Sequence, residues 1–385
     1  MRFLEGKRLD MKLLYIANKR IPTEKAHGIQ IVKMCEAFAN IGLAVNLLVP
    51  TRNNFIKEDV FTYYNVRNNF KVGRFYSPDF YWPGWLDRIS FAVKQLISSL
   101  IILRLATRNK HDFIYSRDEL SILLLSLFNK NIFFEAHKFS DKQSFFYKRF
   151  KKSGVKIVVI SRGLRDKFIK FGFKYNNILF APDGVAVEDF DLTIPKQEAR
   201  KKVALPADKR MIMYAGQLFS WKGADIIARA AEILKNDLFV FVGGLGQDLI
   251  DFRYKFSDVD NILIVGHRPH KDIPVYLKSA DVLVLANSSK EDISKFYTSP
   301  LKMFEYMASG TPIVASRLPS IMEVLNDENS LLVRSDSPVD LADGIRELLN
   351  DNDRAIKISQ KALKDVAKFS WNSRARAILN FISNN

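Results

Sequence analysis

The chain contains little cysteine, glycine or proline. Its single cysteine, Cys35, excludes an intrachain disulfide framework and a cysteine-rich zinc site, so the sequence is compatible with a reducing compartment. Only 17 glycines and 13 prolines occur among 385 residues, and 48% of the residues are hydrophobic, which excludes collagen-like, low-complexity and disordered chains. The length suffices for two ordinary domains with full cores.

Long uncharged apolar runs are also missing. The most apolar stretch, residues 91–106, is interrupted by Lys94, Gln95 and Arg104 and is shorter than the roughly 20 residues that a membrane-spanning helix needs. We therefore predict a largely buried helix there. Residues 1–10 lack the apolar segment of a signal peptide. These features predict a cytoplasmic protein, and they leave peripheral contact with the inner face of a membrane open.

Positive charge is concentrated in the first half of the chain. The formal net charge is +17; residues 1–190 hold 32 Lys and Arg against 17 Asp and Glu, whereas residues 191–385 hold 27 against 25. Such an excess suits an anionic macromolecule or membrane surface. No zinc finger, basic zipper or other docking motif accompanies it, so we expect no nucleic-acid partner.

Short β-rich runs alternate with helical patterns in both halves. We expect strands over 12–17, 45–49, 112–116, 131–136, 156–161 and 177–181, and again over 211–216, 238–244, 261–266, 281–286, 311–316 and 329–333. This alternation is typical of an α/β protein with parallel sheets covered by helices. The polar segment 191–210 is predicted to link two doubly wound domains that face one another across a cleft, with ligands at the carboxyl ends of the strands.

The most informative segment is 297–316. Ser299 is predicted to cap a helix over about 300–309, with Pro300 as its first residue and Gly310 at its end. The N-terminus of such a helix offers unpaired N–H groups and a positive dipole to an anion.

Two side chains of this helix are spaced for a nucleotide. Leu301 and Glu305 lie on one face, about 6 Å apart along the axis. This spacing suits a phosphate at the helix start and a ribose hydroxyl at the carboxylate; a core helix with a solvated Glu305 is the alternative.

A second candidate segment is 214–226. A strand there ends in Gly216, an irregular turn follows, and Lys222 and Gly223 precede a helix predicted over 224–235. A lysine at this position could reach an anion held at the strand ends, although a strand, turn and helix with one lysine is also a common structural arrangement.

Taken together and in this order, several segments resemble glycosyltransferase family 4, whose members have the GT-B fold. The segments that carry the resemblance are AHGIQIVKMCEAFANIGLAV (26–45), FFEAH (133–137), VVISRGLRDKFIKFG (158–172), APDGVAVEDFD (181–191), YAGQLFSWKG (214–223), FVGGLG (241–246), ADVLVLANS (280–288) and SPLKMFEYMASGTPIVAS (299–316).

The resemblance implies two Rossmann-like domains. Residues 1–192 would form an acceptor-side domain and residues 193–370 a nucleotide-sugar domain, with 371–385 as a C-terminal helix that could cross back to the first. Family members bind a nucleotide-diphosphate sugar on the C-terminal domain and normally use no metal, because cationic side chains and a helix N-terminus stabilise the leaving diphosphate. We therefore expect neither a cofactor nor a metal.

The resemblance also implies roles for single residues. Lys222 matches the lysine that contacts the diphosphate, and Glu305 matches the carboxylate that binds ribose. Backbone groups of the helix start hold the diphosphate in the family; the matching positions are Ser299, Pro300, Leu301 and Lys302.

Three further residues match donor-site positions. Gly28 matches a glycine turn after the first strand, where backbone approaches the donor closely. His137 matches a histidine that lines the donor-sugar pocket, with a structural histidine at a strand end as the alternative. Arg268 lies in the loop that usually contacts the base, and an exposed surface arginine is its alternative role.

The sequence departs from the family pattern at two positions. Gln217 stands where family members have an arginine. Tyr297 stands where they have the first of two glutamates, which seven residues separate from the place of Glu305. Glu291 or Asp292 from the preceding loop, or the hydroxyl of Tyr297, could contact the donor sugar instead.

The glycines in FVGGLG resemble a dinucleotide fingerprint only superficially. Gly243, Gly244 and Gly246 lack the G-x-G-x-x-G spacing and a following helix-opening glycine. We expect a tight strand-end turn near the nucleotide.

The activity implied is a retaining transfer of a sugar from a UDP- or GDP-sugar to a hydroxyl of a lipid-linked or polysaccharide acceptor in cell-envelope glycan synthesis. In a front-face route the acceptor attacks from the side on which the diphosphate departs, which requires no carboxylate nucleophile. A noncatalytic sugar-nucleotide-binding protein and a nucleotide-sugar 2-epimerase of the same fold are the alternatives.

The acceptor or membrane side is predicted in the basic first half. In 144–156, aromatic residues alternate with Lys148, Arg149, Lys151 and Lys152, and 74–85 is expected to be an irregular aromatic loop. Basic and aromatic residues together suit anionic lipid headgroups. A solvated basic helix packed on the core is the alternative.

Overall fold

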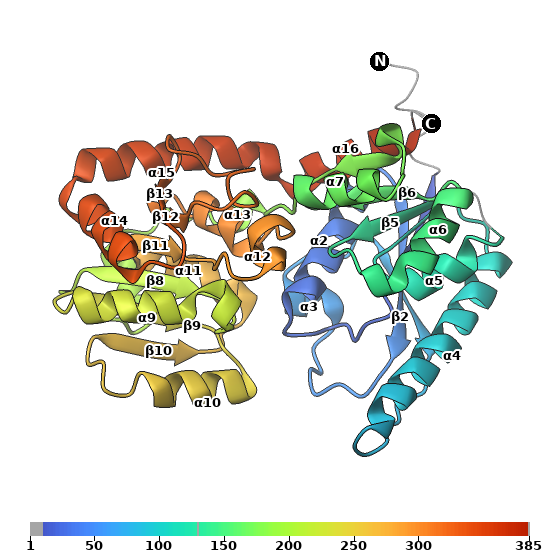
Figure 1. Ribbon diagram of the computed structural model, residues 1–385, viewed down its shortest axis with the longest axis horizontal. Coiled ribbons are helices and arrows are strands. Elements are labelled where there is room, and N and C mark those ends of the chain that lie inside the picture. The colour runs from blue at the N-terminus through green and yellow to red at the C-terminus, as the bar shows by residue number, and fades with distance from the viewer. Residues whose placement is uncertain (1–10, 129–130, 384–385) are drawn as a thin grey trace. The chain divides into compact units, whose positions relative to one another are not determined.

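The computed structural model describes residues 11–128 and 131–383, which form two units (Figure 1). The first unit takes the described residues of Met1–Ile160, Leu164–Ala181 and Trp371–Asn385, and the second takes Ser161–Gly163 and Pro182–Ser370. The chain thus passes to the second unit at 181–182, before the expected boundary at 192–193. The segment that begins at Pro182 is tied to the second unit, because Asp183 donates its N–H to Ser299 Oγ (3.0 Å) and Val185 donates its N–H to the Phe369 carbonyl (3.0 Å).

The first unit is built on a parallel sheet in the order β3-β2-β1-β4-β5-β6-β7. Its strands are β1 (Lys12–Ile16), β2 (Ala44–Thr51), β3 (Lys71–Tyr76), β4 (Phe113–Ser116), β5 (Ile132–Ala136), β6 (Lys156–Val159) and β7 (Ile178–Phe180). The strand order reverses between β1 and β4. The edge strand β3 lies partly in the predicted loop 74–85, and that prediction is wrong for 74–76.

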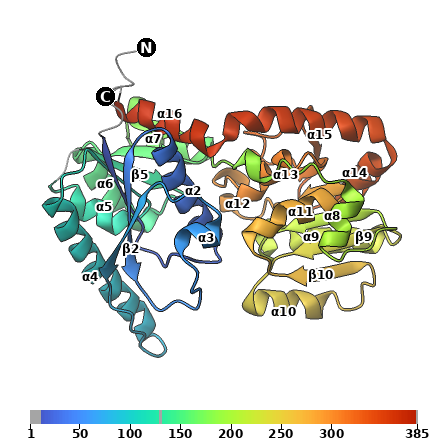
Figure 2. The ribbon, with the colours of Figure 1, turned by 180° about the vertical axis from the view of Figure 1, so that it is seen from behind.

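Helices cover both faces of this sheet. They are α2 (Ala26–Asn40), α3 (Val60–Tyr64), α4 (Leu86–Arg108), α5 (Glu119–Leu125), α6 (Ser144–Lys152), α7 (Arg162–Lys170) and α16 (Trp371–Ser383). Helix α2 packs against α16, while α4 packs against α5 and α5 against α6. Figures 1 and 2 show α4, α5 and α6 on the side of the sheet away from α2.

Helix α4 differs from the prediction of a largely buried helix. Among the described helices it alone is long and apolar enough to cross a membrane, with a mean hydropathy of 1.6 and only 33% of the most apolar window buried. Phe91 and Leu100 are 52% and 49% exposed. The prediction failed because an apolar composition does not say which face of a helix meets the core.

The second unit has a parallel sheet in the order β10-β9-β8-β11-β12-β13, with the reversal between β8 and β11. Its strands are β8 (Met211–Ala215), β9 (Leu238–Val242), β10 (Ile262–Gly266), β11 (Val282–Leu285), β12 (Ile313–Ser316) and β13 (Leu331–Val333). Its helices are α8 (Lys196–Lys202), α9 (Ala224–Ile233), α10 (Gly246–Lys255), α11 (Ile273–Ser279), α12 (Asp292–Phe296), α13 (Leu301–Ala308), α14 (Pro338–Asn350) and α15 (Asn352–Val366). Strands β8, β9, β11, β12 and β13 are buried throughout, as their near-continuous apolar sequences predict, whereas the edge strand β10 is mostly half-buried.

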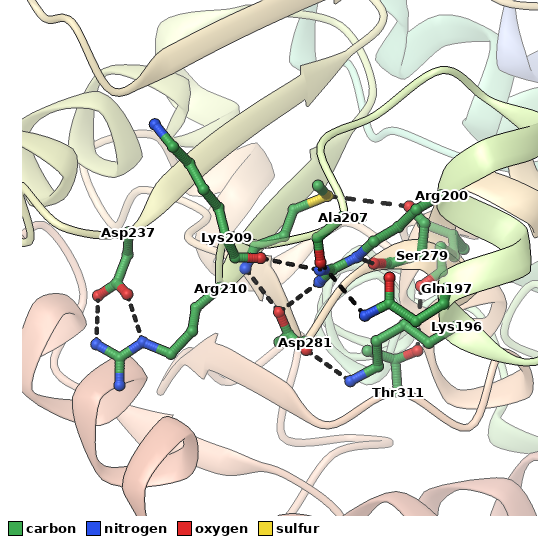
Figure 3. Close-up of polar contacts among 12 residues, drawn as sticks. Lys196, Gln197, Arg200, Ala207, Lys209, Arg210, Asp237, Ser279, Asp281 and Thr311 are labelled. Carbon is green, nitrogen blue, oxygen red and sulfur yellow. Dashed lines mark hydrogen bonds and ion pairs between the residues drawn. The ribbon is translucent and has the colours of Figure 1, made fainter.

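The segment 191–210 is not a linker. It contains α8, whose buried Arg200 donates to the carbonyls of Ser279, Ala207 and Lys209 (2.9 Å each) and to Asp281 Oδ2 (2.7 Å; Figure 3). Lys196 binds the other carboxylate oxygen of Asp281 at 2.6 Å. The sequence alone suggested a linker because the partners that tie this segment to the rest of the unit, Ser279 and Asp281, lie about 80 residues further along the chain.

Candidate functional site

The candidate site of the second unit lies where the strand order reverses. In open α/β sheets, ligands bind outside the carboxyl ends of the strands at such a switch point. The segments after β8 and β11 pack directly on one another there, since a Cβ on Gly223 would lie 1.7 Å from the Ala286 carbonyl oxygen. Gly223 has a φ of +81°, so a side chain is excluded by both space and conformation.

Lys222 is held in the turn after β8. This turn is a short 3-10 helix, Ser220–Lys222, and its Trp221 carbonyl accepts the Ser288 N–H at 3.0 Å and the Ser294 hydroxyl at 3.3 Å. The ammonium lies 5.2 Å from the Phe219 ring centre. Burial disfavours the charged amine and lowers the pKa of Lys222 to about 8.

Helix α13 begins one residue later than predicted. Pro300 is the residue before its first turn, with φ −72° and ψ 126°, and no side chain of the described residues caps it. Ser299 is therefore not the cap. Pro300 occupies the cap position, and the Ser299 hydroxyl oxygen accepts the Asp183 N–H at 3.0 Å. The helix start remains open to an anion.

Lys302, in the first turn of α13, is the most unusual residue of the site. Its Nζ is buried, has no hydrogen-bond partner among the described residues, and lies 3.8 Å from the centre of the Tyr214 ring. Burial and the charge of Lys222 hold the pKa of Lys302 well below its usual range, while Glu305 opposes them. The helix is fixed to the end of β8 by Tyr306, whose hydroxyl accepts the Ala215 N–H at 2.8 Å.

Glu305 is nearly buried and already has a partner. Its Oε1 lies 2.7 Å from Nε2 of His270. Sequence reasoning missed His270, because 35 residues separate the two and no local pattern marks the pair. Arg268 is exposed, as its alternative role anticipated, and donates from Nε to the Tyr276 hydroxyl at 3.0 Å.

Glycine turns line the ends of β8, β9 and β10. A Cβ on Gly243 would lie 2.3 Å from the Gly216 carbonyl oxygen, so these two turns meet backbone to backbone. Gln217 follows, and its carbonyl accepts the Tyr214 hydroxyl at 2.6 Å. The prediction that no glycine opens the next helix is wrong, since α10 begins at Gly246.

The three candidates for the missing glutamate surround α12. Glu291 and Asp292 are exposed at its start, whereas Tyr297 is partly buried directly after it. Tyr297 is the one of the three that lies nearest to α13 along the chain, and its ring centre lies 5.9 Å from that of Phe296.

His137 and Gly28 belong to the first unit. His137 follows β5, and its Nε2 lies 2.6 Å from Oε1 of Glu135. This carboxylate is fully buried and also accepts hydrogen bonds from Gln30 (2.6 Å), Tyr115 and Arg374 (3.1 Å). Although burial favours the neutral acid, Arg374 and His137 hold the pKa of Glu135 well below its usual range. Sequence reasoning missed Glu135, which holds the imidazole in place.

Gly28 does not lie in a glycine turn after the first strand, as expected, but is the third residue of helix α2. A Cβ there would lie 2.1 Å from the Tyr64 hydroxyl, which bonds both the N–H and the carbonyl of Thr23 (2.7 and 2.9 Å). The loop after β1 therefore needs a glycine for packing. The neighbouring His27 is partly buried, and burial and Arg117 lower its pKa to about 4.

The basic cluster lies on α6. Lys148, Lys151 and Lys152 are exposed, whereas Arg149 turns back and donates to the Ser126 carbonyl at 3.3 Å. The aromatic residues between them divide: Tyr147 and Phe150 are fully buried in the core, and Phe145 is 69% exposed. The alternative of a basic helix packed on the core is thus correct for the inner face of α6.

The architecture defines a class of protein. Two parallel-sheet α/β units with these strand orders form the GT-B fold, and solved structures agree. Over 97% of this chain and 98% of the other, sucrose-phosphate synthase from Thermosynechococcus elongatus superposes with a TM-score of 0.76 at 18% identity. Anabaena HepE, solved in complex with UDP and glucose, gives 0.74 at 14% identity over 97% and 100% of the chains. At these identities the likeness shows the fold.

Sequence comparison supports a glycosyltransferase. Residues 195–365 match the model of the family described as glycosyl transferases group 1. The D-inositol 3-phosphate glycosyltransferase of Corynebacterium aurimucosum is 25% identical over 242 residues, which are 58% of this chain and 55% of that protein. The chain thus spans about half the length of the curated relatives it matches.

Proposed function

We propose that the protein is a retaining glycosyltransferase of family 4. It transfers a sugar from a UDP- or GDP-sugar to a hydroxyl of a lipid-linked or polysaccharide acceptor in envelope glycan synthesis. The group 1 family match and the UDP bound to HepE support a nucleotide-sugar donor.

The observation that carries the proposal is the unpartnered ammonium of Lys302 beside the open start of α13. Burial without a partner favours the neutral amine, and a diphosphate bound beside Lys302 would supply the negative charge that favours the ammonium form. The family's arginine is replaced by Gln217, which has no charge. Lys302 compensates for the charge of the missing arginine. Its side chain passes close to Gly216, the residue before Gln217, since a Cβ added to Gly216 would lie 3.8 Å from the Cδ of Lys302.

The residues divide the work as follows. Lys222, Lys302 and the N–H groups of α13 stabilise the negative charge that grows on the diphosphate as the glycosidic bond breaks. Glu305 is oriented by His270 and accepts a hydrogen bond from a ribose hydroxyl. His137 is oriented by Glu135 and contacts the donor sugar. The acceptor hydroxyl attacks from the face that the diphosphate leaves and gives its proton to the departing phosphate oxygen. The amines of Lys222 and Lys302, when protonated, stabilise the charge of the diphosphate that a metal ion would otherwise stabilise. We therefore expect transfer to persist in EDTA.

The acceptor is assigned to the first unit because it carries the excess positive charge. The exposed amines of Lys148, Lys151 and Lys152 are suited to the phosphates of a lipid-linked acceptor or of an anionic membrane surface.

Transfer of label from radiolabelled UDP- and GDP-sugars to a membrane lipid extract tests the proposal. We expect a glycosylated product with the wild type and little with Lys222→Ala. Lys357→Met, which changes an exposed lysine on α15, is the matched control. Release of nucleotide without any glycosylated product would contradict the transferase assignment.

A further inference from the structure

Helix α4 turns polar residues inward and apolar residues outward. Its buried residues are Ser90, Lys94, Ser98, Ser99, Ile102 and Ala106. Its exposed large apolar residues, which we call the α4 face, are Ile89, Phe91, Leu96, Ile97 and Leu100. A surface helix of a soluble protein has the opposite pattern, with the apolar stripe on the core.

Polar contacts fix this orientation. The Ser98 hydroxyl bonds the Ser77 hydroxyl at 2.7 Å, and the Ser99 hydroxyl bonds that of Ser121 on α5 at 3.1 Å. The ammonium of Lys94 lies 3.4 Å from the Tyr81 ring centre. Rotating the helix to bury its apolar residues would break all of these contacts, so the α4 face can be covered only from outside.

The loop before α4 extends the exposed surface with aromatic rings. Tyr81 and Trp85 are 71% and 75% exposed, Trp82 is also exposed, and Tyr76 projects from the edge strand β3. Tyr and Trp combine an apolar ring with a polar edge, which suits the boundary between lipid headgroups and acyl chains.

The charges around the α4 face have one dominant sign. Exposed basic residues in 71–110 are Lys71, Arg74, Arg88, Arg104, Arg108 and Lys110. The acidic residues of the same segment are Asp79 and Asp87. This charge favours an anionic surface over a second copy of the chain, because a symmetric dimer would bring the same basic residues together.

We propose that the α4 face docks in the interface of an anionic lipid bilayer, with the helix lying along the membrane surface. The inward face of α4 packs on the unit, so the helix is anchored to the protein and does not cross the bilayer. Since α4 packs on α5 and α5 on α6, the exposed lysines of α6 follow on the same side of the sheet and add electrostatic attraction.

Flotation of the full chain with lipid vesicles tests this proposal. One set of vesicles is phosphatidylcholine alone, and the other contains equal parts of phosphatidylcholine and phosphatidylglycerol. The variant F91S/L96S/L100S removes the centre of the α4 face. The matched control, I233S/I250S/Y254S, removes exposed apolar residues from α9 and α10 of the second unit.

We expect the wild type and the control to float with the anionic vesicles and the α4 variant to lose at least about tenfold in bound fraction at equal thermal stability. Equal flotation of the α4 variant would overturn the proposal, as would equal binding of the wild type to both vesicles. A lipid-free dimer that the α4 variant converts to monomer would assign the face to a second copy instead. No nucleotide sugar is present, so the result is independent of the donor assignment.

Discussion

Both units bury charged side chains, but they pair them differently. In the first unit Glu135 is enclosed by donors from α2, β4, the residue after β5 and α16. In the second unit the ammonium of Lys302 has an aromatic ring beside it and no hydrogen-bond partner among the described residues. A buried charged group whose hydrogen-bond partners are all supplied by the protein stabilises the fold, whereas one without such partners is available to a ligand. Substitutions at the two centres should therefore affect different measurements.

The largest effect is expected from Arg374→Met. Removing this guanidinium leaves Glu135 buried without its cation, which costs about 3–5 kcal/mol of unfolding free energy. Denaturant unfolding measures the loss. Arg376→Met, on the exposed face of the same helix, should leave stability within about 0.5 kcal/mol of the wild type. Similar stabilities for the two variants would show that the pair does not hold the first unit together.

Lys302→Met should act on the ligand and not on the fold. We expect the dissociation constant for UDP or GDP, whichever binds, to rise about 100-fold, the effect of losing a charge-assisted contact in a buried site. Calorimetric titration measures it. Unfolding free energy should stay level or rise, because methionine removes a buried amine that has no hydrogen-bond partner among the described residues. A variant that loses stability but binds normally would make Lys302 a structural residue.

A smaller effect is expected at Glu305. Glu305→Gln should weaken nucleotide binding about tenfold, since a neutral amide accepts more weakly from a ribose hydroxyl than a carboxylate does. The 2′-deoxynucleotide provides the cross-check. It should bind the wild type more weakly than the ribonucleotide and bind Glu305→Gln with little further loss. If the losses of affinity from Glu305→Gln and from the 2′-deoxynucleotide were additive, Glu305 would not contact the ribose 2′-hydroxyl.

The smallest effect is a pH dependence of diphosphate binding. The pKa of Lys222 is about 8 in the unliganded protein, and an anion beside it must raise that pKa. Binding above about pH 8 therefore takes up a proton, and affinity should fall by up to about tenfold per pH unit as pH rises. In Lys222→Arg, which stays charged, the slope above pH 8 should flatten. An unchanged slope would show that Lys222 does not meet the diphosphate.

Most strands and both parallel sheets could be predicted, because β-rich runs alternate with helical patterns throughout. Strand β3 was missed since its sequence, KVGRFY, contains two basic residues and a glycine and lies at a sheet edge. Ser299 illustrates a different limit. Serine is a residue type that commonly caps helices, but the hydroxyl oxygen of Ser299 accepts the N–H of Asp183, which lies 116 residues away in the sequence.

The candidate site was predictable where its residues are close in sequence, as for Lys302 and Glu305. The partner of Glu305 was not, because His270 lies 35 residues away. Arg374, which pairs with Glu135, was also missed because 239 residues separate the two. The face of α4 was also misjudged, since only the tertiary structure shows that serines and a lysine take the inner positions.

The position of Arg374 makes the first unit a discontinuous domain. Its sheet is complete by residue 180, yet the guanidinium that neutralises Glu135 is supplied after the chain has built the whole second unit. A recombinant fragment ending at Ala181 would leave Glu135 without this guanidinium. During synthesis on the ribosome the first unit would likewise be completed only when α16 has been made, and deletion of α16 would destabilise the unit that holds residues 11–128.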